Sequence, residues 1–169
     1  MNLIFADNVK RARKGDADAF AELYALVYKD LYRIALANLR NNSHDAADVV
    51  SDTVLDAFSS VKNLKDEQAF KAWIVKILIA KIKKKQKDYI NNNTQDIDDV
   101  EQETTDGRFN GIEIMEEIAR LDETERLVLS LSIVSGYSSD EVAKITGINS
   151  ATVRSKLSRA KVKLKSRLS

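Results

Sequence analysis

The chain has no cysteine and no proline, and its 169 residues include only five glycines and one histidine. Without cysteine it has no disulfide, no thiolate zinc site and no thiol nucleophile, and it needs no oxidising compartment. No apolar run reaches the roughly 18 residues of a membrane span, and residues 1–14 lack the pattern of a signal peptide. We therefore expect a soluble, cytoplasmic protein that does not itself insert into a membrane.

Few residues are arranged for catalysis. His44 has no partner ligands for a catalytic zinc, and we expect it on the surface near a helix start. Glycine-rich phosphate loops and nucleophile elbows are absent from the sequence. A magnesium site of facing carboxylates would have only the segment with Asp45, Asp48 and Asp52 to supply it. We expect neither an enzyme nor a cofactor.

Apolar residues recur three and four positions apart, which predicts an all-α protein. The length allows one domain or two small ones. Residues 1–90 form a first helical bundle, with N-caps at Asp16, Ser43 and Asp66, and the first helix runs to about Arg40. The residues expected on the inner faces are Phe20, Leu23, Tyr24, Val27, Leu31, Ile34 and Ala35, then Val49, Val50, Thr53, Val54, Ala57 and Phe58, then Phe70, Trp73, Ile74, Ile77 and Leu78.

Charge is distributed unevenly behind a net charge of +1. Residues 1–90 carry 16 basic and 12 acidic side chains, whereas residues 91–112 carry one basic and six acidic ones. The segment 91–111 is also rich in asparagine and poor in large apolar residues, so it cannot form a core of its own. We expect a flexible acidic linker there.

A second small helical domain is expected over residues 112–169. Ile114, Met115, Ile118 and Leu121 form a short amphipathic helix, and capping-box pairs at Asp122 with Glu125 and at Ser138 with Glu141 start the next two. The helix after Ser138 buries Val142, Ala143 and Ile145 and stops at Gly147. A last helix begins at Asn149 or Ser150 and buries Val153, Leu157, Ala160 and Leu164.

The short helix, the turn at Gly147 and the long last helix have the spacing of a helix-turn-helix, whose second helix enters the DNA major groove. Residues 150–169 hold seven basic side chains and no acidic one. At 100° per residue, the outward arc of the last helix carries hydrogen-bonding side chains, and Lys161, Lys163, Lys165 and Arg167 can neutralise phosphates. A solvated cationic helix face is the alternative. The outward residues are Thr152, Arg154, Ser155, Ser158 and Arg159.

The segments 136–143 (GYSSDEVA) and 147–160 (GINSATVRSKLSRA) resemble the promoter-binding domain of extracytoplasmic-function (ECF) sigma factors, in the sigma-70 family. Residues 45–58 (DAADVVSDTVLDAF) resemble sigma region 2, and residues 70–74 (FKAWI) resemble the motif that follows it. The resemblance implies that residues 1–90 are region 2, which binds core polymerase and the minus-10 element. It also implies that residues 112–169 are region 4, which binds minus-35 DNA.

Carried over to this sequence, the resemblance assigns three groups of side chains and adds Lys156 to the minus-35 contacts. One group docks the clamp helices of the largest polymerase subunit. A second lines the loop that binds a base flipped out of the minus-10 element, and a third contacts DNA phosphates. Phe70 and Trp73 are read as core rather than as stacking platforms. The three groups are Asp48, Ser51, Asp52, Leu55 and Phe58; Asn63, Lys65 and Asp66; and Lys81, Lys84 and Lys85, together with Lys161 and Lys163.

The sequence therefore predicts a promoter-specificity subunit of RNA polymerase, and the resemblance implies a cognate anti-sigma factor that could hold it at the membrane. The acidic linker is either a plain tether or a nucleic-acid mimic in the RNA exit region of polymerase. Asp45 and Asp48 are equally well explained as acids at a helix start. The alternative functions are a helix-turn-helix regulator that acts without polymerase and a helical adaptor for protein contacts.

Overall fold

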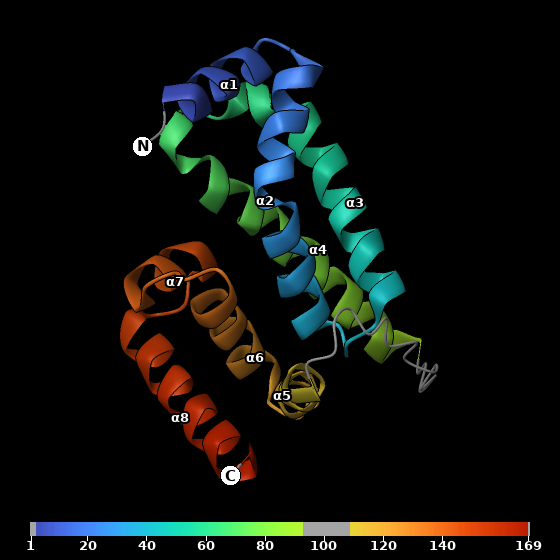
Figure 1. Ribbon diagram of the computed structural model, residues 1–169, viewed down its shortest axis with the longest axis vertical. Coiled ribbons are helices and arrows are strands. Elements are labelled where there is room, and N and C mark those ends of the chain that lie inside the picture. Colours follow the sequence, from blue (N-terminus) through green and yellow to red (C-terminus); the bar gives the residue numbers. More distant parts are fainter. Residues whose placement is uncertain (1–2, 93–108, 169) are drawn as a thin grey trace.

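The computed structural model describes residues 3–92 and 109–168, and every regular element within these ranges is helical (Figure 1). Residues 93–108 of the expected linker lie outside the described residues. None of the described helices is long and apolar enough to cross a membrane. In chain order the elements are α1 (Leu3–Arg13), α2 (Ala17–Asn38), α3 (Ser43–Ser60), the 3-10 turns η1 (Val61–Asn63) and η2 (Glu67–Ala69), α4 (Phe70–Asn91), α5 (Phe109–Ala119), α6 (Glu123–Leu129), the π-helical turn η3 (Ser130–Val134), α7 (Ser139–Thr146) and α8 (Ser150–Leu168).

Helices α1 to α4 form a first unit around a core centred on Phe70, which is fully buried. The ring of Phe70 packs edge-on against Phe5 and Phe20, with centroid separations of 6.0 and 6.4 Å. Trp73 is half-buried and packs against the same core. Both Phe70 and Trp73 therefore serve packing, as the spacing predicted.

Helix starts in this unit follow local capping chemistry. Asp16 caps α2 by accepting from the backbone N–H groups of Asp18 and Ala19, as predicted. The prediction of Ser43 as the next cap is wrong by one residue. Asn42 has the extended backbone that a cap needs, and its side chain accepts from the Asp45 N–H at 3.0 Å, whereas Ser43 is already helical.

Helix α1 was not predicted by the sequence patterns. It crosses the end of the bundle and is held there by Phe5, which contacts Phe70, and by the buried Asn8, whose amide donates to Glu22 at 2.8 Å. Only one turn separates it from α2, with Gly15 in the left-handed region at a φ of +94°. The turn places the basic end of α1 beside η1 and η2.

Helices α5 to α8 form a second unit. Asp122 caps α6 through the Glu125 N–H at 2.8 Å, but the Glu125 side chain does not complete the predicted capping box, because it pairs with α8 instead. Ser138 and Glu141 do form the predicted box at the start of α7. Helix α6 was expected to continue toward Gly136, and the structure interrupts it with the π-helical turn η3.

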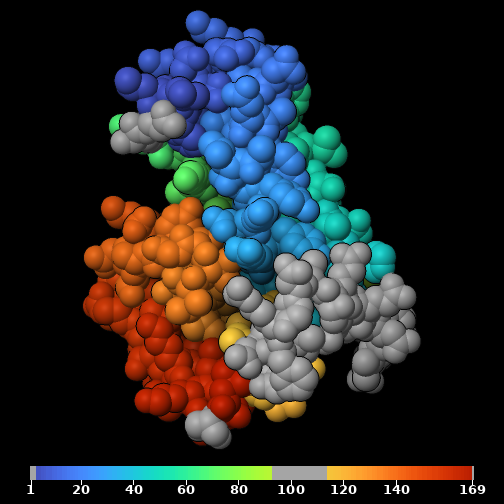
Figure 2. All heavy atoms as spheres, in the orientation of Figure 1, coloured from blue at the N-terminus to red at the C-terminus, as the bar shows by residue number. Residues whose placement is uncertain are grey.

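The two units pack against each other. Helix α2 contacts α5, α6 and η3, and α4 contacts α7, so these elements of the second unit lie alongside the first (Figures 1 and 2). Leu131 and Val142 belong to the same buried cluster as Leu31 and Ile34. Segments far apart in the sequence thus share one apolar core.

Candidate nucleic-acid and polymerase interface

The turn between α7 and α8 is built by local hydrogen bonds. Gly147 ends α7 with a φ of +77°, a conformation that favours glycine, and its N–H donates to the Ala143 carbonyl at 2.9 Å. The Ile148 N–H donates to Thr146 Oγ1, and Asn149 Oδ1 accepts from the Ala151 N–H at 2.8 Å. These contacts place the start of α8 directly after a tight turn, as a helix-turn-helix requires.

One face of α8 is buried and the opposite face is free. Val153 and Ala160 are fully buried, and Leu157 and Leu164 are partly buried. Of the side chains predicted to contact minus-35 DNA, Lys156 is half-buried and the others are exposed. The exposed ones are Thr152, Arg154, Ser155, Ser158 and Arg159.

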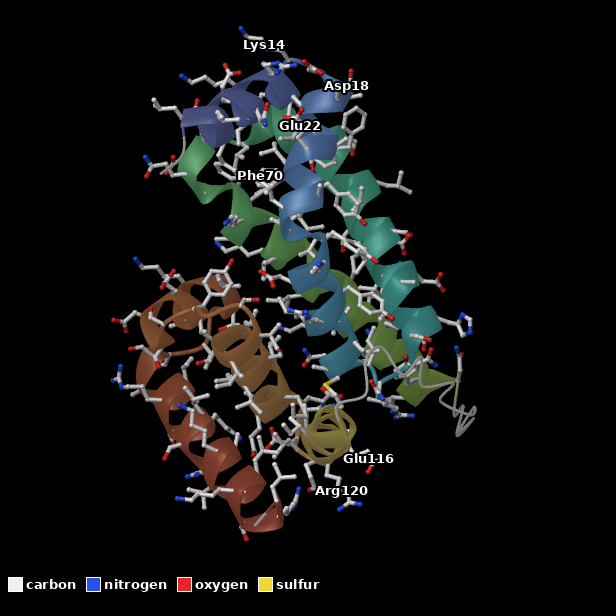
Figure 3. All side chains as sticks on the ribbon, viewed as in Figure 1. Lys14, Asp18, Glu22, Phe70, Glu116 and Arg120 are labelled. Carbon is white, nitrogen blue, oxygen red and sulfur yellow. The ribbon has the colours of Figure 1, made fainter. Side chains whose placement is uncertain are left out.

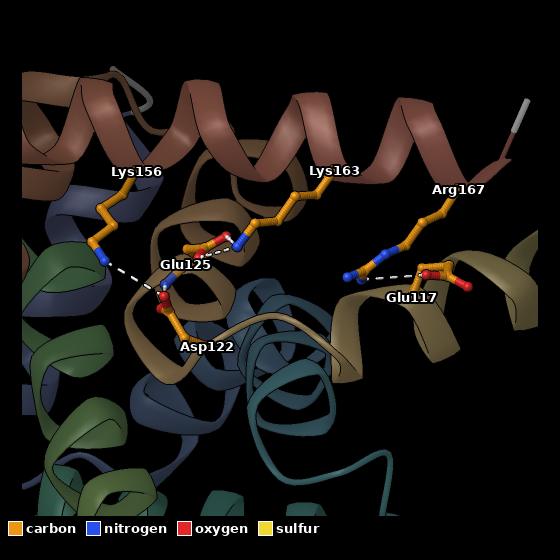
Figure 4. A network of polar contacts seen from close by, with 6 residues as sticks. All are labelled: Glu117, Asp122, Glu125, Lys156, Lys163 and Arg167. Carbon is orange, nitrogen blue, oxygen red and sulfur yellow. Dashed lines mark hydrogen bonds and ion pairs between the residues drawn. The ribbon is translucent and has the colours of Figure 1, made fainter.

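Ion pairs join Lys156, Lys163 and Arg167 of α8 to acidic residues of α5 and α6 (Figure 4), and we call this row of pairs the ladder. Lys163 Nζ lies 2.8 and 3.1 Å from the two carboxylate oxygens of Glu125, a side chain that is only 3% exposed. Lys156 Nζ lies 3.5 Å from Asp122 Oδ2, and Arg167 pairs with Glu117. Two of the predicted DNA-binding lysines, Lys156 and Lys163, thus hold α8 on its own unit.

The ladder also changes the acidity of Asp122. Hydrogen bonding to Glu125, through its side chain and its backbone N–H, and the nearby Lys156 ammonium lower the pKa of the Asp122 carboxyl to about 2. Asp122 therefore stays ionised as both the α6 cap and the partner of Lys156. Sequence reasoning identified Asp122 and Glu125 only as caps, because their basic partners lie 34 and 38 residues away.

Arg154 lies near an acid of the preceding helix. Its Nη1 is 3.8 Å from Asp140 Oδ1, and both side chains are mostly exposed. At this separation in water the pair is weak, so Arg154 is free to turn toward another partner.

The face of α3 that points away from the bundle carries the predicted polymerase-docking residues. Asp48, Ser51 and Asp52 are exposed, and Leu55 is 69% exposed. Phe58, expected on the inner face, is instead 42% exposed, because it lies at the edge of the bundle with its ring against Phe20 at 5.2 Å.

Asp45 differs from Asp48 in its surroundings. The Tyr89 hydroxyl donates to Asp45 Oδ2, and Lys85 Nζ lies 3.4 Å from Oδ1. Burial, followed by this hydrogen bond, raises the pKa of Tyr89. Asp45 therefore joins α3 to α4, whereas Asp48 remains on the free face.

The loop proposed for the minus-10 element consists of η1, η2 and the residues between them. Asn63 and Lys65 are exposed. Asp66 Oδ1 accepts from the Gln68 N–H at 2.9 Å, which is the capping role that the sequence predicted. Leu64, which stands between Asn63 and Lys65 in the sequence, is buried and anchors the loop on the bundle.

The predicted phosphate-tracking lysines of α4 divide into two kinds. Lys81 pairs with Asp56, and Lys85 pairs with Asp45, so both link α4 to α3. Lys84 is exposed and has no ion pair within the described residues. His44 is exposed in the first turn of α3, as predicted, and the described residues contain no group of three or more potential metal ligands.

Comparison with known proteins assigns both units. Residues 23–89 match the family model described as Sigma-70 region 2, and residues 112–164 match Sigma-70, region 4. The chain is 26% identical to the ECF RNA polymerase sigma factor SigW of Bacillus subtilis (strain 168), over 99% of this chain and 98% of that protein. The chain belongs to the ECF group of the sigma-70 family. This sigma factor is also 27% identical to RNA polymerase sigma factor SigV of the same organism, over 78% of this chain and 80% of that protein.

Solved structures share the fold of this ECF sigma factor. The sigma factor RpoE in complex with the anti-sigma factor NepR from Bartonella quintana aligns with a TM-score of 0.75 and 24% identity, covering 88% of this chain and 96% of that one. CnrH in complex with the cytosolic domain of CnrY aligns with a TM-score of 0.73 and 22% identity, over 98% and 97% of the two chains. As a sigma factor, the protein is a transcription initiation factor that directs core RNA polymerase to promoters.

Proposed function

We propose that this sigma factor selects its promoters through α8 in the major groove of the minus-35 element. The observation that carries the proposal is the exposed arc of α8, in which five side chains able to hydrogen-bond lie outward while Val153 and Ala160 are buried. Arginine binds guanine O6 and N7 bidentately, which gives Arg154 and Arg159 the base-reading role. Lys161 and Lys165, both exposed, neutralise phosphates at the same groove.

The first unit supplies the other two contacts. The exposed Asn63 and Lys65 beside Asp66 contact the minus-10 element, where a base leaves the stack. The free face of α3 docks the clamp helices of the largest polymerase subunit, with Leu55 as its apolar centre. Residues 1–90 and 112–169 act as the two functional domains, and the protein has no catalytic activity of its own.

The sigma factor acts in the cytoplasm, where core polymerase and DNA are. A cognate anti-sigma factor regulates it by covering the same faces. The aligned structure of RpoE is a complex with the anti-sigma factor NepR, which supports this part of the proposal, and the aligned structure of CnrH is a complex with the cytosolic domain of CnrY.

The first experiment is in vitro transcription on a pool of genomic fragments, with bacterial core polymerase alone and with the sigma factor added. New transcript starts that share two spaced upstream elements are expected. Arg154→Ala plus Arg159→Ala should abolish selection of the upstream element, whereas Lys161→Ala plus Lys165→Ala should weaken binding to all sequences alike. DNA binding that is sequence-specific without core polymerase, and with no new starts, would contradict the proposal.

Polymerase docking is tested with two exposed leucines. Leu55→Ala on α3 should weaken binding to core polymerase by about tenfold, since removing one or two buried methylene or methyl groups from an apolar contact costs roughly 0.8 kcal/mol each. Leu26→Ala on α2 is the matched control, because Leu26 is 62% exposed and lies outside the proposed docking face. Equal affinity of the two variants for core polymerase would refute the assignment of α3.

A further inference from the structure

A cluster of basic side chains lies where α1 meets η1, and the roles assigned so far do not use it. Lys10, Arg13 and Lys14 come from the end of α1, and Lys62 comes from η1, about 50 residues later in the chain. Together with Glu67 these side chains line one hollow on the surface. We call Lys10, Arg13, Lys14 and Lys62 the α1 basic surface.

Basic residues at the end of α1 have an ordinary explanation, because cations favour the negative end of a helix dipole. That explanation does not cover Lys62, which belongs to another element and is brought to the hollow only by the packing of α1 on η1. Convergence of lysines from two elements is unfavourable by itself, since their charges repel. An anion bound in the hollow would relieve that repulsion.

Ion pairs within the protein neutralise only part of the positive charge at the end of α1 and on η1. Arg11 pairs with Asp16 at 2.7 Å and Arg13 pairs with Glu67 at 3.2 Å. Within the described residues, Lys10, Lys14 and Lys62 form no ion pair, and all three are exposed. Figure 3 shows Lys14 at the extremity of the bundle, beyond the end of α1.

The position of the hollow indicates its partner. Lys62 directly precedes Asn63, the first residue of the loop proposed to contact the minus-10 element, so DNA that reaches Asn63 passes beside the α1 basic surface. Helix α1 also precedes the part of the chain that matches sigma region 2, which starts at residue 23. The match therefore assigns α1 no role.

We propose that the α1 basic surface binds the phosphate backbone of promoter DNA next to the minus-10 element. The inference rests on the proposed role of the η1–η2 loop in promoter binding. Lysines act as compact point charges on flexible stems, so this contact raises affinity for DNA without reading its sequence. Arg13, tied to Glu67, holds α1 in place beside η2.

The test measures how the affinity of the assembled holoenzyme for a promoter fragment depends on salt. Each lost phosphate contact reduces the slope of log affinity against log salt by about 0.9 on duplex DNA or about 0.7 on a single strand. Lys14→Ala plus Lys62→Ala should therefore lower the slope by about 1.4 to 1.8 and weaken binding about tenfold or more at moderate salt. Lys14→Arg plus Lys62→Arg should restore both values.

The matched control is Lys29→Ala plus Arg33→Ala, which removes the same charge from exposed positions on α2. The control should leave the slope unchanged. If net charge alone set the slope, the control would lower it as well. Binding to core polymerase without DNA is measured for every variant. An unchanged slope for Lys14→Ala plus Lys62→Ala overturns the inference, and so does a loss of affinity for core polymerase alone, which would assign the surface to an acidic protein partner.

The two levels of the proposal fail differently. If the wild-type holoenzyme starts transcription normally and only the salt slopes of the variants are unaffected, the α1 basic surface is not a DNA contact and the proposed function stands. If the wild-type holoenzyme produces no new starts, the proposed function fails and the inference fails with it.

Discussion

Asn38 and Ser130, 92 residues apart, share a hydrogen bond that joins the two helical units: the Asn38 Nδ2 donates to Ser130 Oγ at 2.9 Å. Both side chains are buried. The same Nδ2 donates to the Ile34 carbonyl, the Ser130 hydroxyl donates to the Leu127 carbonyl, and the main-chain carbonyl of Asn38 accepts from the Gln86 side chain. This small polar network lies within an otherwise apolar contact between α2 and η3.

Ser130→Ala should lower the free energy of unfolding by about 1–2 kcal/mol, because Asn38 loses one buried partner and keeps the Ile34 carbonyl. Urea unfolding monitored by circular dichroism measures the change. Ser135→Ala is the matched control, since the buried Ser135 hydroxyl has no hydrogen-bond partner among the described residues, and its removal should be neutral or slightly stabilising. Equal losses for the two variants would contradict the role of the Asn38 contact.

Lys163→Met tests whether Lys163 stabilises the second unit or contacts DNA. The substitution leaves the Glu125 carboxylate buried without its ammonium partner, and we expect a loss of about 1–3 kcal/mol in the free energy of unfolding. Adding Glu125→Gln should recover most of that loss, which a double-mutant cycle quantifies. Lys161→Met, at an exposed position two residues away, should change stability by less than about 0.5 kcal/mol.

A different result would identify Lys163 as a phosphate contact. In that case Lys163→Met would leave stability unchanged and would lower the salt slope of DNA binding by about 0.9.

Stability below pH 4 should depend on Asp122. Because its pKa falls from 3.8 to about 2 on folding, the ionised carboxyl stabilises the folded state fully above pH 4, and that contribution disappears as the pH falls through 2. Asp122→Asn keeps a good N-cap but cannot titrate. We therefore expect the unfolding free energy of the variant to fall less steeply between pH 4 and pH 2 than that of the wild type.

The control for this experiment is Asp7→Asn, at an exposed position on α1 with no ion pair in the described part of the chain. It should follow the wild-type pH dependence. If Asp122→Asn does so too, the ladder does not set the acid stability of the second unit.

Asp140→Ala should strengthen binding to the upstream promoter element about two- to threefold at low salt. The substitution removes an acid 3.8 Å from Arg154 and beside the proposed DNA face, and the gain should fade as salt screens the charge. Asp7→Ala changes the net charge equally on α1, in the other helical unit, and should have little effect. Fluorescence anisotropy titration of the upstream element measures the affinity of both variants. Weaker binding by Asp140→Ala would show that Asp140 orients Arg154 productively.

Several features could be read directly from the sequence because they depend on neighbouring residues. The cap at Asp16, the capping box of Ser138 with Glu141 and the stop at Gly147 are local hydrogen-bond chemistry, and the structure confirms all three. Two predictions were wrong by a small margin. The cap of α3 is Asn42 rather than Ser43, and Phe58 lies half-exposed at the edge of the bundle rather than on the inner face of α3. Helix α1 was missed although the basic residues at its end stand close together in the sequence.

The sequence alone determined the positions of most helices, though not of α1, the tight turn between α7 and α8, and the concentration of basic charge near the C-terminus, because a period of 3.6 residues and a cap at a turn act over a few positions. Only the tertiary structure decided which charges meet. Lys163 pairs with Glu125, Lys85 pairs with Asp45, and Lys62 lies beside the end of α1, because whole helices pack in this arrangement. Packing is set by the complementary shapes of apolar surfaces distant in the chain, and no local pattern of residues contains that information.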